Sequence, residues 1–309
     1  MASSIYSHEA LAQFSYFAVA LGVLVVVGAL DDRYDLPALA RFLAQVCAAL
    51  LMVGGAGVTA HDIGYVFFGG LVELGWFSIP FSLAIVLTAI NAFNMIDGSD
   101  GLAGIQALVA LAFLGFAAVV AGATTYLPIL IALTGCVSGF LIFNWPVRRR
   151  RKVHAFMGDA GSTMLGFSLA WISLELSQAP VRAISPVVIL WIFATPIYEL
   201  FSSMVRRLAQ RRSPFHGDSQ HLHHVLRRAG YSARAVALIV MASGATTAAI
   251  GVGGYVAGVE DGWLFLAWLA LGVVYHVIFV SGLVFPKGAV RTARDDLLAA
   301  KLSTGSRQR

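Results

Sequence analysis

Charge is scarce in this sequence. Of its 309 residues only 12% are Asp, Glu, Lys or Arg, against about 25% in ordinary soluble domains, whereas 59% are hydrophobic. So few charges leave too little polar surface to cover a core of this size in water. The composition therefore argues against a soluble enzyme, and its high apolar content argues against a disordered chain.

Cysteines and the features of a signal peptide are scarce as well. The two cysteines, Cys47 and Cys136, lie inside apolar runs, which predicts neither a disulfide framework nor a thiolate metal cluster. Residues 1–4 carry no basic side chain, and the first apolar run leads into Asp31 and Asp32 instead of a cleavage site, so we expect no signal peptide. The lack of an internal repeat gives no support to an inverted-repeat transporter.

Long apolar runs are abundant. Several approach the ~20 residues that cross a bilayer, and the run 102–143 is long enough for two spans, broken near 123–128. The predicted fold class is all-α, a polytopic integral membrane bundle of about nine transmembrane helices with catalytic loops on its cytoplasmic face. The other runs lie at 11–30, 42–60, 74–96, 160–181, 183–205, 235–259 and 263–285.

Basic residues set the expected orientation. If the loops that contain Asp31, Asp97 and Arg148 share one side with the C-terminal tail, 20 of the 21 Lys and Arg lie on that side and only Arg182 lies opposite. This predicts that the N-terminus lies outside and the C-terminus lies in the cytoplasm. The formal charge of +5 then reflects topology and contact with lipid, so we expect no nucleic-acid partner.

The chain is expected to form one transmembrane domain, residues 1–286, followed by a basic cytoplasmic tail, residues 287–309. The segment 61–78, with Gly69-Gly70 between two apolar stretches, is typical of a short hairpin on the outer face. The sequence leaves a homodimer open.

Carboxylates gather at the expected cytoplasmic ends of the spans. Any one of them alone would be explained by a helix cap or a solvated loop, but three separate loops bring six of them to one face. Their mutual repulsion would be relieved by a divalent cation, and oxygen ligands favour Mg²⁺, or Mn²⁺ as the alternative, over zinc. The six are Asp31, Asp32, Asp35, Asp97, Asp100 and Asp159.

Two motifs place such carboxylates beside helix starts. In residues 91–104, NAFNMIDGSDGLAG, side chains three apart share a helix face, and the glycines let the backbone approach a ligand. In residues 156–163, FMGDAGST, Asp159 introduces a helix whose first N–H groups could hold phosphate oxygens. Two half-sites of this kind suggest a diphosphate substrate. The run Arg148–Lys152 is first a positive-inside anchor, with attraction of anionic phosphate as its second interpretation.

Four of the eight histidines lie within nine residues, between His216 and His224. No cysteine is near them and the carboxylates already account for a metal, so zinc is not favoured. Imidazoles can instead donate hydrogen bonds to phosphate or sugar hydroxyls. We interpret this segment as a ligand-binding loop outside every span, the alternative being a solvated loop without function.

With these residues in view, the sequence resembles the polyprenyl-phosphate N-acetylhexosamine-1-phosphate transferases, and within them the bacterial undecaprenyl-phosphate GlcNAc-1-phosphate branch of glycosyltransferase family 4. Four motifs carry the resemblance, namely GALDDRYDLP, NAFNMIDGSDGLAG, FMGDAGST and QHLHH. The spacing His221-Leu222-His223-His224 is similar to the GlcNAc-1-phosphate branch, whereas the MurNAc-pentapeptide branch has consecutive histidines.

The resemblance implies a Mg²⁺-dependent reaction at the bilayer. A sugar 1-phosphate, most simply GlcNAc-1-phosphate, would pass from a UDP-N-acetylhexosamine to undecaprenyl phosphate, with release of UMP. The product would initiate a cell-surface polysaccharide such as the O-antigen of lipopolysaccharide. By matching position, Asp159 and Asn94 would be metal ligands supported by Asp97, and Asp31 and Asp32 would position or deprotonate the lipid phosphate.

The resemblance also implies contacts with the sugar donor. Asp100 and Asn144 would hold the nucleotide, and Phe156 would stack on its uracil. Gly158 and Ser162 would contact its phosphates at a helix start. His221, His223 and His224 would contact the sugar and the diphosphate.

Two departures from the family pattern affect the expected activity. Relatives usually carry further N-terminal helices and a basic segment, so we expect this chain to insert in the membrane but to transfer weakly compared with a longer form. Ser219 stands where relatives tend to have an arginine, which removes one phosphate-binding charge that Arg211 or Arg212 could replace.

Two other functional classes stay open. The residues Asp31 to Asp35 match the DDxxD site of intramembrane prenyltransferases, although that class needs a second aspartate-rich helix and does not use the other motifs. A cation-coupled transporter would place acids at the bilayer midplane, whereas only Glu175 and Glu199 lie inside the expected spans, near their ends.

Overall fold

The computed structural model describes residues 8–97, 101–145, 157–209, 211 and 221–281. This part of the chain is all-helical, and its one strand-like feature is a single bridge between Asp62 and Glu73. The predicted all-α class is therefore confirmed. The helices are α1 (His8–Tyr34), α2 (Ala38–Leu50), α3 (Ser78–Ile96), α4 (Leu102–Val120), α5 (Leu127–Asn144), α6 (Gly158–Ser177), α7 (Pro186–Ile192), α8 (Ala194–Ala209), α9 (Leu222–Arg228), α10 (Ala233–Val256) and α11 (Asp261–Ser281).

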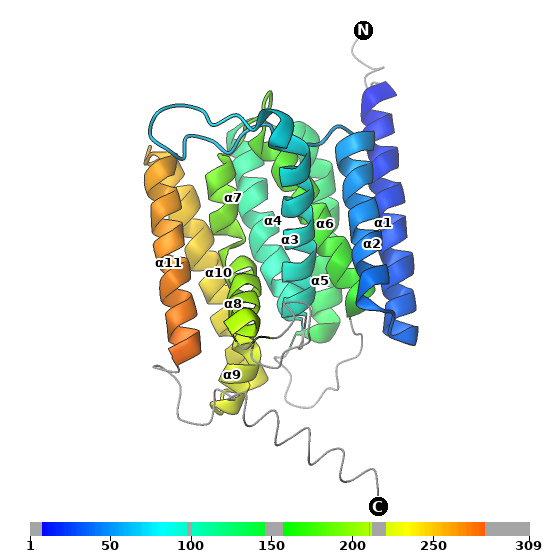
Figure 1. Ribbon diagram of the computed structural model, residues 1–309, viewed down its shortest axis with the longest axis vertical. Helices are drawn as coiled ribbons and strands as arrows, with labels where there is room; N and C mark the ends of the chain where they lie inside the picture. Colours follow the sequence, from blue (N-terminus) through cyan, green and yellow to red (C-terminus); the bar gives the residue numbers. More distant parts are fainter. Residues whose placement is uncertain (1–7, 98–100, 146–156, 210, 212–220, 282–309) are drawn as a thin grey trace, which may run out of the picture.

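Most of these helices run side by side in one bundle (Figure 1). Seven segments of the described chain are long and apolar enough to cross a membrane, and there are eight if the bent pair α7 and α8 counts as one span. The uncharged run 102–143 forms two helices separated by a turn at Thr124–Tyr126, as predicted. The chain is a polytopic membrane bundle, with seven or eight candidate spans where the apolar runs had indicated nine.

The difference lies in α6, which occupies the expected span 160–181 but is not among the apolar candidates. It lies inside the bundle, where it packs against α1, α3 and α4, and 15 of its 20 residues are buried. A helix surrounded by other helices does not need the apolar surface that lipid demands. Its serines and Glu175 are therefore tolerated.

Glycines set how closely α6 is packed. A Cβ atom at Gly28 of α1 would lie 2.4 Å from Cα of Ala160, and one at Gly166 would lie 2.7 Å from the carbonyl oxygen of Ala89 in α3. Any side chain at these positions would force backbones apart, as at other close helix contacts in membranes. The glycine at 28 thereby brings the first turn of α6 against the end of α1.

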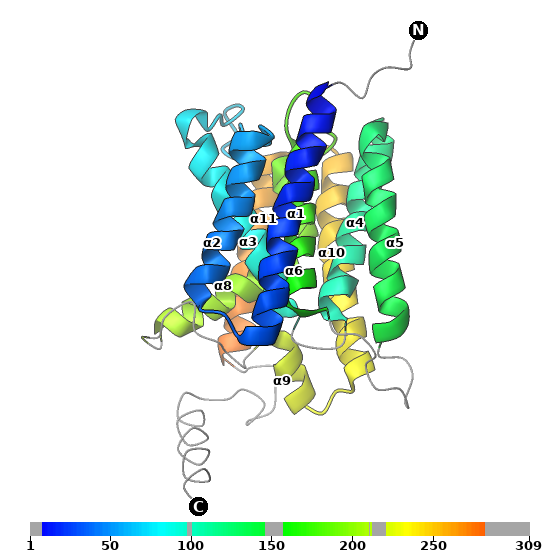
Figure 2. The same ribbon diagram turned by 90° about the vertical axis from the view of Figure 1, so that its right-hand side faces the viewer.

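The single helix expected at 183–205 is two helices in the structure, because α7 and α8 meet at an angle of 79° with Phe193 between them. Pro196 lies in the first turn of α8. A proline ring has no N–H and clashes with the carbonyl four residues earlier, so a continuous helix through Ile192 is disfavoured. As a result α8 runs obliquely across the lower part of the bundle (Figure 2).

Residues 61–77 form a hairpin-like loop, as predicted for this segment. The loop covers the end of the bundle that lies away from α8 and α9 (Figure 1). Gln178, just after α6, accepts hydrogen bonds from the N–H groups of His61 and Asp62 at 2.8 and 3.2 Å. Arg182 forms an ion pair with Asp62. The one basic residue expected on this side is thus neutralised within the protein.

Candidate active site

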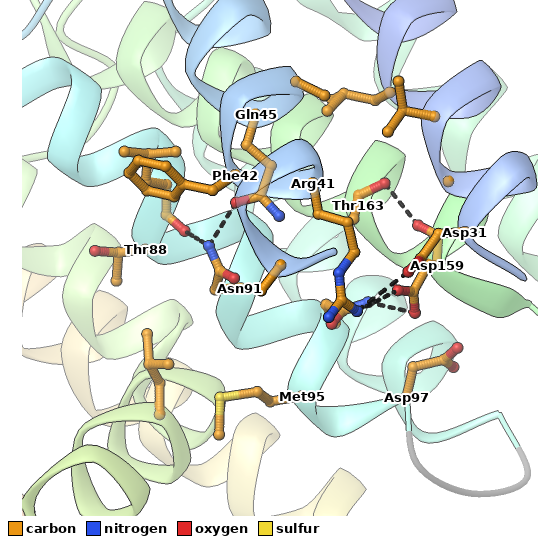
Figure 3. Close-up of a pocket in the computed structure, with 18 of the residues that line it drawn as sticks. Asp31, Arg41, Phe42, Gln45, Thr88, Asn91, Met95, Asp97, Asp159 and Thr163 are labelled. Atoms are coloured by element: carbon orange, nitrogen blue, oxygen red, sulfur yellow. Dashed lines mark hydrogen bonds and ion pairs between the residues drawn. The ribbon is translucent and has the colours of Figure 1, made fainter. Parts of the chain in front are cut away.

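A cavity of about 610 Å³ lies at the end of the bundle away from the hairpin-like loop, between α1, α2, α3, α6, α8 and α9 (Figure 3). One part of its wall is polar and the other is apolar. The polar part includes Asp31, Arg41, Gln45, Asn91, Asn94, Asp97, Asp159, Arg207, His221, His223 and His224, and the apolar part includes Leu24, Val27, Phe42, Leu87, Leu200 and Met204. Residues from four distant sequence motifs therefore meet in one cavity.

Arg41 of α2 extends towards two neighbouring carboxylates (Figure 3). Its Nη1 atom donates to Asp31 Oδ2 at 3.1 Å and lies 3.5 Å from Asp159 Oδ2. Asp31 is buried, and its other oxygen accepts the N–H of Leu36 at 2.7 Å. The guanidinium therefore neutralises part of the negative charge that the sequence had led us to assign to a metal ion alone.

Asn94 at the end of α3 is joined to the start of α6. Its Nδ2 atom donates to Asp159 Oδ1 at 2.8 Å and to Ser162 Oγ at 3.1 Å. Ser162 is fully buried, and its hydroxyl donates to the carbonyl oxygen of Gly158. The observed contacts of Ser162 position Asn94, and the predicted contact of Ser162 with substrate phosphate stays a prediction.

Asp32 caps α6 from the neighbouring helix. Its carboxylate accepts the N–H of Asp159 at 2.9 Å and lies 3.5 Å from the N–H of Ala160. Gly158 has a φ of +66°, and a Cβ atom there would lie 2.3 Å from Asp32 Oδ2. In this structure the carboxylate of Asp32 occupies these helix-start N–H groups, and the predicted contact of Gly158 with substrate phosphate stays a prediction.

Asp97 lies just beyond the end of α3, at the edge of the cavity. Burial raises the pKa of its carboxyl to about 7, with smaller contributions from the negative charges of Asp159 and Asp32. A carboxyl in that position is only partly ionised at neutral pH unless positive charge is added. A cation bound beside Asp97 would stabilise the ionised form of this carboxyl.

The donor atoms fit one mode of metal binding. The described residues contain no group of three His, Cys, Asp or Glu side chains arranged to hold a metal. Mg²⁺ commonly uses one or two protein carboxylates and takes its other ligands from water and substrate phosphates. Asp159, Asp97 and the Oδ1 atom of Asn94 match that mode, and they do not form a cage made of protein alone.

From His221 onwards the histidine segment is helical and largely buried, where the sequence had predicted a ligand-binding loop. His221 precedes α9, His223 and His224 lie in its first turn, and the side chains of Leu222 and Val225 belong to the hydrophobic core. This part of the chain is helical because Leu222, Val225 and Leu226 recur at helical spacing.

His223 is the most deeply buried of the three, at 3% exposed. Burial, followed by the nearby imidazoles of His224 and His221, lowers the pKa of His223 to about 3, so it is neutral at any physiological pH. Its Nε2 atom has no hydrogen-bond partner in the described part of the chain. A buried polar atom left without a partner at a cavity wall is one that a ligand can satisfy.

Other predicted site residues lie elsewhere. Asn144 is buried at the end of α5, where a Cβ atom at Gly101 would lie 3.4 Å from its carbonyl oxygen, and it does not line the cavity. Several predictions fall outside the described residues. These are Asp100, Phe156, the run 148–152, Arg212, Ser219 and the tail 287–309.

Two cavity residues were missed in the sequence, Arg41 and Gln45. A signal for both was present, because they are the only strongly polar side chains of α2 and stand four residues apart, on one face of the helix. Gln45 Oε1 accepts a hydrogen bond from Asn91 Nδ2 at 2.8 Å (Figure 3). Polar side chains on an apolar transmembrane helix usually face the protein interior or a cavity.

We expect Asp97→Asn to stabilise the metal-free protein at pH 8. The folded state holds Asp97 with a pKa near 7, above the unfolded value of about 3.9, so ionisation lowers stability progressively as the pH rises from about 4 to 7. Asparagine does not ionise. The variant should unfold a few degrees higher than the parent in EDTA at pH 8, and the difference should shrink towards pH 5.

Thermal unfolding in detergent, followed by tryptophan fluorescence, checks this expectation. Added Mg²⁺ should raise the unfolding temperature of the parent and leave that of Asp97→Asn nearly unchanged. A variant less stable than the parent at pH 8 in EDTA would show that Asp97 is stabilised by contacts that its charge requires.

Comparison with known proteins gives the relationship directly. Residues 14–177 match the model of glycosyl transferase family 4. The chain is 36% identical over 238 residues to proteins named undecaprenyl-phosphate alpha-N-acetylglucosaminyl 1-phosphate transferase from Escherichia coli K12 and Salmonella typhimurium, a match that covers 77% of this chain and 65% of each relative. A relative of the same name from Yersinia pestis is 34% identical over 270 residues, which are 87% of this chain and 74% of that protein.

The chain thus spans about 65% of the length of the first two relatives. The family match includes α1 to α6, which carry Asp31, Arg41, Asn94, Asp97 and Asp159. A family model that covers more than half of the chain, together with relatives at this level of identity, leaves one assignment. The chain belongs to glycosyl transferase family 4.

Proposed function

We propose that the protein transfers a sugar 1-phosphate, GlcNAc-1-phosphate by analogy with its relatives, from a UDP-sugar to undecaprenyl phosphate. One observation carries the proposal. The motif residues from α1, α3, α6 and α9 line a single cavity whose wall is polar on one side and apolar on the other. Such a wall suits two anionic substrates, one of which brings a hydrocarbon chain.

The reaction exchanges one phosphoanhydride for another. An oxygen of the lipid phosphate attacks the phosphorus that bears the sugar, the bond from that phosphorus to the UMP oxygen breaks, and UMP leaves with the electron pair. A phosphate monoester is already largely dianionic near neutral pH, because its second pKa is about 6, so the nucleophile needs little help from a base. The main barrier is the mutual repulsion of two anions.

Positive groups in the cavity would reduce the repulsion between the two substrates. Arg41 supplies a guanidinium that both Asp31 and Asp159 hold in place. A divalent cation held by Asp159, Asp97 and Asn94 would neutralise charge on the diphosphate oxygens. Asp32 keeps the first turn of α6, and with it Asp159, at the end of α1. We assign Asp31 and Asp32 this positioning of charged groups in preference to removal of a proton.

The apolar wall supplies the surface for the lipid. Phe42 of α2, Leu87 of α3 and Leu200 of α8 border the cavity. A prenyl chain lying on these side chains would present its phosphate to Arg41. In this arrangement the lipid reaches the site from the bilayer and the nucleotide reaches it from water.

The membrane topology belongs to the same proposal. With α6 counted as a central crossing and α7–α8 as one broken crossing, the chain spans the membrane nine times. The described basic residues apart from Arg182 lie at the cavity end, which indicates the cytoplasmic face of a bacterial inner membrane. UDP-sugars are made in the cytoplasm, so the donor would meet the cavity there.

The two rival classes fit the site less well. For a DDxxD prenyltransferase the three acids should share one cavity, yet Asp31 lines it while Asp32 caps α6 and Asp35 is exposed outside the wall. For a cation-coupled transporter the acids should lie at mid-membrane. Glu175 instead lies near the end of α6 farthest from the cavity, bonded to the hydroxyl of Tyr126 at 2.6 Å.

The assay is direct. Purified protein with UDP-GlcNAc, undecaprenyl phosphate and Mg²⁺ should release UMP and form a lipid-linked sugar, and EDTA should stop both. UDP-GalNAc, supplied in a parallel reaction, should give a lower rate. Absence of UMP release with every UDP-N-acetylhexosamine tried, or full activity in EDTA, would contradict the proposal.

A further inference from the structure

Glu199, in the second turn of α8, is a buried acid beside the cavity but not in its wall, and is 5% exposed. Its two carboxylate oxygens have different partners. Oε1 accepts a hydrogen bond from the hydroxyl of Tyr275 in α11. Oε2 accepts the N–H of Leu222 at 3.0 Å and lies 3.4 Å from Nδ1 of His221. A buried carboxylate is costly unless it is fully bonded, so these contacts are expected to hold together.

The contact with Leu222 fixes the start of α9. Leu222 is the first residue of that helix, and its N–H is one of those that a helix leaves without an internal partner. A helix of seven residues has little stability of its own, so a cap supplied from α8 ties it to the bundle. The rings of His223 and His224 are 4.1 Å apart, and fixing the first turn therefore fixes the whole histidine group.

The contact with His221 decides which ring nitrogen carries hydrogen. A carboxylate can only accept hydrogen bonds, so the Nδ1 atom that faces it must be the donor. The Oγ atom of Ser203 is also 3.4 Å from Nδ1, accepts a hydrogen bond from Arg206, and can serve as a second acceptor for the same hydrogen. In a neutral imidazole this leaves Nε2 bare, and His221 lines the cavity.

We infer that Glu199 is a positioning residue of the site, which holds α9 against α8 and keeps His221 as the Nδ1–H tautomer. The bare Nε2 atom of His221 then accepts a hydrogen bond from the ligand. That chemistry matches a hydroxyl or amide N–H of an N-acetylhexosamine, and it does not match an anionic phosphate oxygen. The inference of a sugar contact rests on the proposed transfer reaction, whereas the tautomer itself does not.

The tautomer is tested first, because it can be read without any reaction. Protein labelled with ¹⁵N-histidine is examined by NMR at about pH 8, where ordinary imidazoles are neutral. The signals of His221 are identified by their loss in His221→Ala. We expect a hydrogen-bearing Nδ1 in the parent protein and a shift towards the other tautomer in Glu199→Gln. A parent His221 with its hydrogen on Nε2 would overturn the inference.

A double-mutant cycle tests the link to the reaction. Glu199→Gln should lower kcat/KM for the UDP-sugar by about 10- to 100-fold, the range typical of residues that orient a functional histidine. In protein that already carries His221→Ala, the same change should have less than about a threefold further effect, because the two residues act as one unit. Losses that multiply in full, or an undiminished rate for His221→Ala, would refute the link.

Two further variants separate positioning from folding. Glu199→Asp keeps the charge on a shorter side chain and should retain more activity than Glu199→Gln; the reverse order would count against the inference. Glu175→Gln is the matched control, since Glu175 is also a helix glutamate that accepts from a tyrosine hydroxyl, at the far end of the bundle. It should transfer at nearly the parent rate.

A failure of the proposed function looks different. It would appear as absence of transfer by the parent protein, with the NMR result for His221 unaffected.

Discussion

Asp159→Asn is expected to reduce transfer by about 10³-fold or more while membrane insertion and folding are unchanged. Asparagine has the size of aspartate, and its Oδ1 atom can still accept from Asn94, whereas an amide nitrogen replaces the oxygen that faces Arg41. What disappears is the negative charge that holds the guanidinium and the proposed cation next to the diphosphate. Loss of one preorganised electrostatic contact in a site closed to water typically costs about 10²–10³-fold in rate, and here two positive groups depend on the same carboxylate.

The measurement is UMP release by purified variant and parent at saturating substrates, with Mg²⁺ varied. Asp35→Asn is the control, since Asp35 lies near the same end of the bundle, is exposed, and has a φ of +51° that asparagine adopts readily. The control should match the parent. An Asp159→Asn protein that turns over at the parent rate would remove the carboxylate, and the cation with it, from the mechanism.

The second large effect is expected at Arg41. Arg41→Ala leaves the carboxylates of Asp31 and Asp159 facing each other without their shared partner, so charge is lost where two anions must meet. We expect at least about a hundredfold loss of kcat/KM for both substrates. Arg41→Lys should recover much of it, because both observed contacts are made by the single atom Nη1 and one ammonium group can replace them.

The comparison is made by initial rates with the lipid phosphate and the UDP-sugar varied in turn. A hydrophilic replacement without charge, Arg41→Gln, serves as the control for size and should resemble Arg41→Ala. If Arg41→Gln resembles Arg41→Lys instead, hydrogen bonding and not charge is the contribution of this residue. If Arg41→Ala transfers normally, the guanidinium has no part in the reaction.

The bundle itself could be predicted from the sequence because a helix that crosses a bilayer needs a long apolar run. The runs at 102–143 and 235–259 agree in position with α4, α5 and α10. The same physics explains the failures. In α6 neighbouring helices replace lipid as the environment, and at Phe193 a bend arises from Pro196 and tertiary packing, which no count of apolar residues reports.

The part of the site made by acidic and amide side chains could be predicted, because such residues are rare in an apolar sequence. Acidic and amide side chains at span ends, such as Asp31, Asn94 and Asp159, were recognised, and the structure places them in one cavity. Their partners were harder to find. The cap that Asp32 gives to α6 joins residues 127 positions apart, and the contacts of Arg41 with Asp159 span 118. Pairings at such separation depend on how helices meet, which single-sequence patterns do not contain.

The order of synthesis determines when the hairpin-like loop, residues 61–77, can be attached to the rest of the bundle. The loop that carries His61 and Asp62 leaves the ribosome 116 to 117 residues before Gln178, the side chain that fastens it. At about 5–20 residues per second, on the order of 10 s separate the two. A nascent chain stopped at residue 177 would hold all of α1 to α6 and would still lack the hydrogen bonds of Gln178 and the ion pair of Arg182 with this loop. These contacts can therefore form only after α6 has been completed and the chain has continued past it.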